Sequence, residues 1–141
     1  YYKFTEKLVK GEKIELYNQG KNKRDFTYID DVVDAIEKIM TSKPVMDKNG
    51  VAYEIYNIGN NHPVETVEFV RILVDALKEY RVMDEDFDID DSIVLCDAVA
   101  GDVDVTYADI DRLWENFDVK PKISIVEGLN KFSKWYFDYS K

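Results

Sequence analysis

The sequence has few residues that could form a covalent cross-link or bind a transition metal. Its 141 residues include one cysteine, Cys96, and one histidine, His62. They can therefore form neither an internal disulfide nor a zinc site built from cysteine and histidine. We expect Cys96, in an apolar run, to be buried and inert, and His62, in a polar loop, to be solvated. A single cysteine also favours a reducing, cytoplasmic setting.

Long apolar runs and excess positive charge are absent as well. No segment approaches the ~18 consecutive apolar residues that a membrane-spanning helix needs, and no basic stretch followed by an apolar run suggests a signal peptide. The formal net charge is −10, from 29 acidic and 19 basic residues. Such a surface repels phosphate, so we expect neither nucleic acid nor membrane as a partner. An anionic ligand would need a local cationic pocket.

The six glycines are scattered along the chain, and no Gly-x-Gly-x-x-Gly motif occurs. A dinucleotide pyrophosphate needs closely spaced glycines at a helix N-terminus, so we expect no NAD site in these residues. One Tyr-x-x-x-Lys match, Tyr17 to Lys21, contains Asn18 and Gly20, which favour a turn. A catalytic pair must share one helix face, and we therefore assign no catalytic residue.

The acidic segment at residues 84–91 resembles part of a calcium-binding loop. Asp86, Asp88 and Asp90 have the 1-3-5 spacing of such a loop. However, Asp91 stands where glycine is needed, and the twelfth position is Asp97 rather than glutamate. We expect a solvated loop and no metal site.

Apolar periodicity predicts helices that alternate with short strands in one α/β domain, residues 1–141. The expected helices are residues 1–10, 30–43, 64–80, 109–117 and 124–139, and the expected strands are 14–17, 24–29, 53–59 and 93–96. Asp30 or Asp31 is the predicted cap of the second helix, and the strand at 93–96 is expected to be buried. Trp114, Trp135 and Tyr136 are expected in the core or at a covered interface. Four short strands make a thin sheet, so this core is incomplete unless something else packs on it.

Four segments together resemble a known enzyme family. Residues 24–33, RDFTYIDDVV, are similar to the RDFTYIDDIV signature of the extended short-chain dehydrogenase/reductases, and most similar to that of UDP-glucuronate 4-epimerases. Residues 4–17 resemble the helix, glycine and strand that precede this signature. Residues 56–65, with YNIGN and PVE, and residues 101–136, which begin with Gly-Asp-Val, resemble two later elements. The four occur in the family's order and cover nearly the whole chain.

This resemblance implies a nucleotide-sugar-binding part of an NAD-dependent epimerase/dehydratase. Family members bind NAD on an N-terminal Rossmann half that also carries the catalytic Tyr-x-x-x-Lys, and they bind the UDP-sugar mainly on the C-terminal part. They oxidise C4 of the sugar and return the hydride to the other face. Because the chain starts at Tyr1, inside an expected helix, we expect a C-terminal fragment without the Rossmann half, inactive alone and without a cofactor of its own.

Arg24 is the leading binding residue that the resemblance implies, because the family's arginine at this position contacts the UDP diphosphate. A planar guanidinium can bind two phosphate oxygens at once, and Lys21 and Lys23 add local positive charge. The alternative is an ion pair of Arg24 with Asp25 or Asp30 that only anchors the turn.

The resemblance assigns three further residues to the nucleotide site. Glu15 and Tyr17 occupy the strand that holds uracil in the family, and Asp102 occupies the Gly-Asp turn that contacts the nucleotide or orders its loop. An ordinary strand and a self-capping turn are the alternatives. UDP-galactose 4-epimerases often carry a second phosphate-binding arginine three residues before this aspartate, where this chain has Val99, so the galactose substrate is less favoured.

Three functional readings remain open. The chain is the UDP-glucuronate/UDP-galacturonate-binding part of a 4-epimerase, or the corresponding part of a UDP-glucuronate decarboxylase or a nucleotide-sugar 4,6-dehydratase. Alternatively, it is a non-catalytic interaction domain. In each case the partners are the Rossmann half, or a second copy that self-associates through the surface this half would cover.

Overall fold

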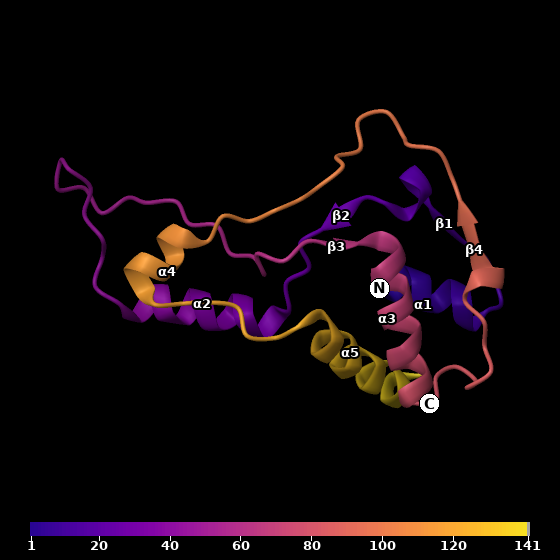
Figure 1. Ribbon diagram of the computed structural model, residues 1–141. Helices are drawn as coiled ribbons and strands as arrows, with labels where there is room; N and C mark the ends of the chain where they lie inside the picture. Colours follow the sequence, from indigo (N-terminus) through magenta and orange to yellow (C-terminus); the bar gives the residue numbers. More distant parts are fainter. Residues whose placement is uncertain (141) are drawn as a thin grey trace.

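The computed structural model describes residues 1–140, which form an α/β arrangement of amphipathic helices and a few short strands, as predicted. The helices are α1 (Tyr2–Val9), α2 (Ile29–Thr41), α3 (Thr66–Glu79), α4 (Asp111–Phe117) and α5 (Ile125–Tyr139). The strands are β1 (Ile14–Leu16), β2 (Lys23–Arg24), β3 (Val64–Glu65) and β4 (Ile93–Leu95), and two 3-10 turns are η1 (Tyr17–Gly20) and η2 (Asp90–Ser92). Figure 1 shows these elements in two regions. We call α1, α3, α5, β1 and β4 the body, and α2, α4 and residues 43–60 the arm.

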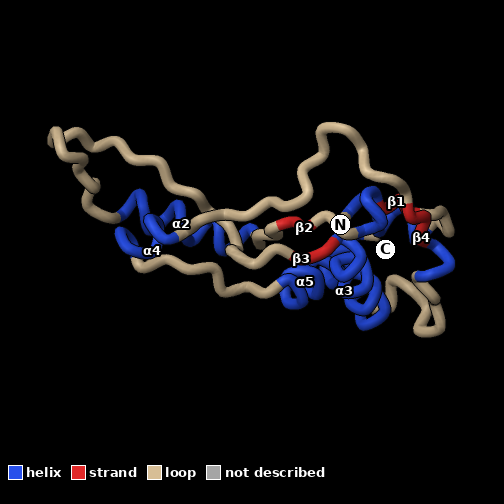
Figure 2. Tube along the Cα trace, turned by 45° about the horizontal axis from the view of Figure 1, so that its top comes forward, coloured by secondary structure: helices blue, strands red, loops and turns tan. Residues whose placement is uncertain are grey.

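The body has a conventional apolar core around α3. Val70, Leu73 and Leu77 lie on one face of this helix and have no exposed surface, as its 3.6-residue periodicity predicts. This face packs against α5, which lies beside α3 in both Figure 1 and Figure 2. Phe26 stacks on Phe69 with ring centroids 4.3 Å apart, and so connects the strand-to-helix segment to this core.

The strands form two separate pairs rather than one thin sheet. β1 runs parallel to β4, with Ile14 opposite Ile93, and β2 runs antiparallel to β3, with Arg24 opposite Val64. The helix predicted from residue 64 begins two residues later, because Val64 and Glu65 pair with β2. The expectation of a buried strand at 93–96 is wrong: β1 is the strand that pairs with β4, and Val94 and Leu95 are exposed.

The outer position of β4 leaves its side chains accessible. Leu95 is 53% exposed, and Cys96, expected to be buried, is only half-buried.

The arm has a much smaller core than the body. Ala35, Leu113 and Phe117 are its buried hydrophobic residues. The opposite side of α2 carries an apolar stripe at i, i+4, i+7 and i+11 that the described chain does not cover: Ile29, Val33, Ile36 and Met40 are all at least 46% exposed. The arm therefore exposes apolar surface that a helix in a complete core would bury.

Two local predictions in the arm are wrong. Residues 53–59 form no strand, because they pair with no strand among residues 1–140, and a segment becomes a strand only by pairing. The cap of α2 is Tyr28, without a side-chain hydrogen bond. Asp31 lies in the first turn instead, and its carboxylate accepts the backbone N–H groups of Lys122 and Ile123.

Both tryptophans are half-exposed rather than buried. Trp114 in the arm is 45% exposed and Trp135 on α5 is 47% exposed. The Lys120 ammonium lies 3.3 Å from the centroid of the Trp114 ring, and Trp135 stacks on Tyr139 with centroids 5.0 Å apart. Of the three aromatic residues expected in the core or at a covered interface, Tyr136 lies in the core of the described chain.

No described helix has the length and apolar character to cross a membrane. Within residues 1–140, no three His, Cys, Asp or Glu side chains gather as potential metal ligands. In the acidic segment, Asp90 pairs with Arg71 at 2.9 Å.

Candidate functional site

The four residues proposed for nucleotide binding lie in two contacting pairs at the edge of the body. Arg24 lies 2.7 Å from Asp102 (Nη2 to Oδ1), although 78 positions separate them in the sequence. The Tyr17 hydroxyl donates a hydrogen bond to Glu15 at 3.4 Å. β1 and η1 carry the second pair, and β2 and the loop after β4 carry the first.

Arg24 is held by the loop that contains Asp102, not by a neighbouring aspartate. Besides the ion pair, its Nη1 donates to the carbonyls of Lys23 (2.9 Å) and Val103 (2.7 Å). The alternative pairing with Asp25 or Asp30 is therefore wrong. The Arg24 side chain keeps 27% of its surface exposed and that of Asp102 keeps 38%, so the pair is accessible to a ligand.

Backbone hydrogen bonds keep the loop in place beside β2. The Lys23 N–H donates to the Asp104 carbonyl at 2.7 Å, and the Thr106 N–H donates to the Lys23 carbonyl at 3.0 Å. Since Lys23 directly precedes Arg24, these bonds bring residues 102–106 alongside the arginine. The Lys23 ammonium itself lies 3.6 Å from Glu65, which partly offsets the local positive charge expected from the sequence.

Asn22 links the two pairs, and sequence reasoning missed it. Its side-chain amide donates to Asp102 Oδ2 at 2.7 Å and its side-chain oxygen accepts from Asn18 at 2.6 Å. Asn18 follows Tyr17, so a continuous set of hydrogen bonds runs from the η1 turn to Arg24. The sequence signal for Asn22 is its place between Lys21 and Lys23. An asparagine in an exposed turn would give the same signal.

Tyr17 and Lys21 do not form a catalytic pair. Asn18 and Gln19 have positive φ values of 51° and 57°, so the chain between Tyr17 and Lys21 is a left-handed turn and not an α-helical face. The negative charge of Glu15 raises the pKa of the Tyr17 hydroxyl, with smaller contributions from burial and its hydrogen bond to Glu15. A tyrosine base needs the opposite shift, whereas a protonated 45%-exposed ring is free to contact a base face.

Asp25 connects three backbone segments beside Arg24. Its carboxylate accepts the N–H groups of Asn61, His62 and Ala108 at 3.1–3.2 Å. Gly59 permits this approach, because a Cβ there would collide with that of Ala108. A cleft of about 410 Å³ opens at this junction, lined by Asp25, Thr27, residues 56–59 and residues 106–108.

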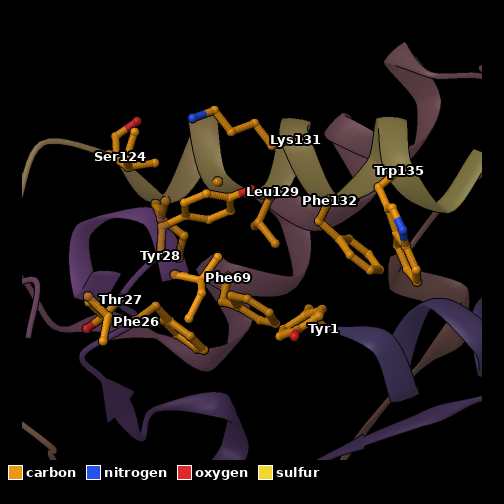
Figure 3. A pocket seen from close by; sticks show the side chains of 15 residues that line it. Tyr1, Phe26, Thr27, Tyr28, Phe69, Ser124, Leu129, Lys131, Phe132 and Trp135 are labelled. Carbon is orange, nitrogen blue, oxygen red and sulfur yellow. The ribbon is translucent and has the colours of Figure 1, made fainter. Parts of the chain in front are cut away.

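A second cavity, of about 540 Å³, is apolar and contains none of the four proposed residues. It lies between Phe26–Val32, Phe69 and the start of α5. Figure 3 shows Tyr28 beneath α5 with Lys131 above its ring, 5.0 Å from its centroid. Gly128 leaves room for the Tyr28 ring beside α5, since a Cβ there would lie 3.0 Å from Tyr28 Cδ2. The four residues that the sequence nominates for nucleotide binding therefore lie outside this larger cavity.

Among residues 1–140, the glycines with positive φ do not gather in one loop. Gly11, Gly50 and Gly101 have positive φ values, but each lies in a separate turn with open space around it. None of these turns forms the closely spaced glycine loop at a helix N-terminus that a pyrophosphate needs.

Comparison with known proteins finds relatives in one enzyme family. Residues 1–59 match the NAD dependent epimerase/dehydratase family. Protein CapI of Staphylococcus aureus is 38% identical over 152 aligned residues, which cover 99% of this chain and 42% of CapI. UDP-glucuronate 4-epimerase 2 of Arabidopsis thaliana is 32% identical, over 100% of this chain and 32% of that protein.

A solved structure extends the comparison to the fold. The UDP-glucose 4-epimerase of Thermotoga maritima, determined with UDP-glucose, superposes with a TM-score of 0.71 and 27% identity. The superposition covers 98% of this chain and 39% of that structure. The chain thus spans less than half the length of each of these proteins.

Proposed function

This chain belongs to the NAD-dependent epimerase/dehydratase family, and from that premise we propose that residues 1–141 bind the nucleoside diphosphate of a UDP-sugar. One observation carries the proposal: Arg24 and Asp102, 78 positions apart, meet at 2.7 Å next to the turn that holds Tyr17. An arginine and a carboxylate beside an accessible aromatic ring suit the diphosphate, ribose and base of one nucleotide.

Each residue has a distinct part in this proposal. The Arg24 guanidinium binds phosphate oxygens. Because the chain as a whole is acidic, this cation supplies the local positive charge that an anionic ligand needs. The Tyr17 ring and the β1 backbone beside Glu15 contact the uracil. Asp102 accepts a hydrogen bond from the ribose or holds the loop that closes over it. The sugar then extends into the adjoining cleft near Asp25.

We further propose that the complete protein epimerises C4 of UDP-glucuronate to UDP-galacturonate, with NAD bound outside residues 1–141. NAD would supply the hydride acceptor and donor, and the role of the present residues is to hold the nucleotide so that C4 faces it. The apolar stripe on α2, with Ile36 46% and Met40 79% exposed, is the surface on which the NAD-binding part would pack. The 32% identity to a UDP-glucuronate 4-epimerase supports this reaction over decarboxylation or dehydration.

Calorimetry of the complete protein with UDP tests the binding proposal. Arg24→Ala should weaken UDP binding about 10- to 100-fold, since a hydrogen bond to a charged group is worth about 1.5–3 kcal/mol. Arg71→Ala is a matched control: it also removes an arginine paired with an aspartate, at 2.9 Å, but away from the proposed site. It should leave the UDP affinity unchanged.

Product analysis with NAD and UDP-glucuronate tests the reaction. The proposal requires UDP-galacturonate, whereas loss of CO₂ identifies a decarboxylase and loss of water a dehydratase. No UDP binding by the wild type at several millimolar, together with self-association through α2, would indicate an interaction domain instead.

A further inference from the structure

We infer that Asn22 is a positioning residue that sets the Asp102 carboxylate, and through it Arg24, for binding a diphosphate. The inference rests on the proposed nucleotide site and adds to it a residue outside the four named there. Asn22 is 6% exposed, so it acts through its neighbours and does not itself contact the ligand.

The Asn22 amide determines how Asp102 can pair with Arg24. It occupies Asp102 Oδ2 at 2.7 Å, while Oδ1 accepts Arg24 Nη2 at the same distance. Arginine and carboxylate often form two parallel hydrogen bonds, but here the amide of Asn22 lies against the second oxygen and Arg24 Nη1 donates to the Lys23 and Val103 carbonyls. The ion pair uses one nitrogen and one oxygen, and the Nε and second Nη2 hydrogens are the donors for a phosphate.

The side-chain oxygen of Asn22 contacts the turn beside Tyr17, where the nucleoside is proposed to bind. Its Oδ1 accepts from Asn18 Nδ2 at 2.6 Å, next to Tyr17. Asn18 and Gln19 both adopt left-handed backbone conformations, which cost free energy for residues other than glycine and persist only where the surroundings hold them. The contact from Asn22 is one such restraint.

The body fixes Asn22 in turn. Its carbonyl accepts both the backbone N–H and the hydroxyl of Thr66, each at 2.9 Å. Thr66 is the first residue of α3, the central helix of the body. Asn22 is thereby attached to the apolar core, and its amide meets Asp102 in a fixed orientation. The asparagine amide supplies a donor for a carboxylate and an acceptor for an amide on two separate atoms, so it can contact both neighbours at once.

A residue exchange tests this role with the charge held constant. Asn22→Asp keeps the acceptor for Asn18 but places a carboxylate against Asp102. The double variant Asn22→Asp/Asp102→Asn reverses the hydrogen bond and has the wild-type net charge. In the complete protein we expect UDP affinity to fall at least about tenfold in Asn22→Asp, and to return to within about threefold of wild type in the double variant, as coupled neighbours do.

Uridine serves as the second ligand, because it lacks the diphosphate. The positioning role requires that Asn22→Asp change the ratio of UDP to uridine affinity, whereas a purely structural defect would weaken both ligands equally. Equal UDP binding by wild type and Asn22→Asp, or a double variant no better than the product of the single effects, overturns the inference alone. Failure of the wild type to bind UDP overturns the proposed function, and the positioning role falls with it.

Discussion

The body and the arm differ in how completely they bury their own apolar surface. The cluster around α3 contains eleven buried hydrophobic residues, all in the body except Val64 of the adjacent β3, whereas the arm encloses three and exposes the α2 stripe. Both regions contain amphipathic helices of similar length, α3 with 14 residues and α2 with 13. The difference therefore lies in what packs on each helix. The body buries the apolar face of its central helix within the chain, whereas α2 in the arm leaves an apolar stripe exposed.

A core truncation should produce the largest effect and should separate the two regions. Leu73→Ala, at a side chain with no exposed surface, is expected to lower the free energy of unfolding by about 2–5 kcal/mol through lost burial and a residual cavity. Met40→Ala on α2, at 79% exposure, should change it by no more than about 0.5 kcal/mol. Urea titrations measure both, and similar losses would contradict the exposure of Met40 on the α2 stripe.

Asp31 provides a second, smaller test, because it fixes α2 to the segment that leads into α5. Asp31→Ala leaves the Lys122 and Ile123 N–H groups without their acceptor, and should cost about 1–3 kcal/mol. Asp30→Ala removes only an exposed pair with Lys131 at 3.4 Å and should cost less than about 0.5 kcal/mol. The midpoint temperatures of thermal unfolding distinguish the two variants. Equal decreases in Tm would show that the buried Asp31 carboxylate contributes no more than the surface pair.

Charge on the α2 stripe should affect association and not folding. Val33 on α2 and Val126 on α5 are 52% and 51% exposed, which makes Val33→Glu and Val126→Glu a matched pair. If α2 is the contact surface, Val33→Glu should weaken self-association of residues 1–141 about tenfold, since burying a valine is worth about 1.5 kcal/mol. Sedimentation velocity measures this. Equal weakening by Val126→Glu would locate the contact on the body instead.

The smallest effect is expected at the turn after α2, and it depends on pH. Backbone hydrogen bonds from Val51 and Asn49 lower the pKa of Asp47 below its ordinary 3.8, against a smaller opposing effect of burial. The charged form is the one stabilised, so the turn is fully held above pH 3.8 and opens as the pH falls through the lower folded value. The amide chemical shifts of Asn49 and Val51 should titrate below 3.8, and a midpoint above it would contradict this.

The sequence predicted the body better than the arm for a physical reason. α3 and α5 are long and strongly periodic, so their local pattern determines both their helical state and their buried face. Residues 53–59 have the composition of a strand, but pairing requires a neighbour, and no neighbour can be read from local sequence. The exposure of β4 could not be predicted for the same reason, because it depends on how many other strands lie beside it.

The candidate site was predictable only in part. Resemblance nominated Arg24 and Asp102, but their mutual ion pair depends on a loop that returns 78 positions later. The expected alternatives, Asp25 and Asp30, were sequence neighbours of Arg24, and the structure uses the first of them to hold backbone N–H groups instead. The sequence did not indicate a role for Asn22, because that role depends entirely on the burial of its side chain.

The placement of the two tryptophans has an optical consequence. Trp114 belongs to the arm and lies against the Lys120 ammonium, whereas Trp135 belongs to the body and stacks on Tyr139. Each region thus carries one indole in a different electrostatic environment. Replacing either with phenylalanine leaves a single tryptophan. The tryptophan emission of Trp114 alone would then follow the docking of a partner on the arm, and that of Trp135 alone would follow the melting of the body.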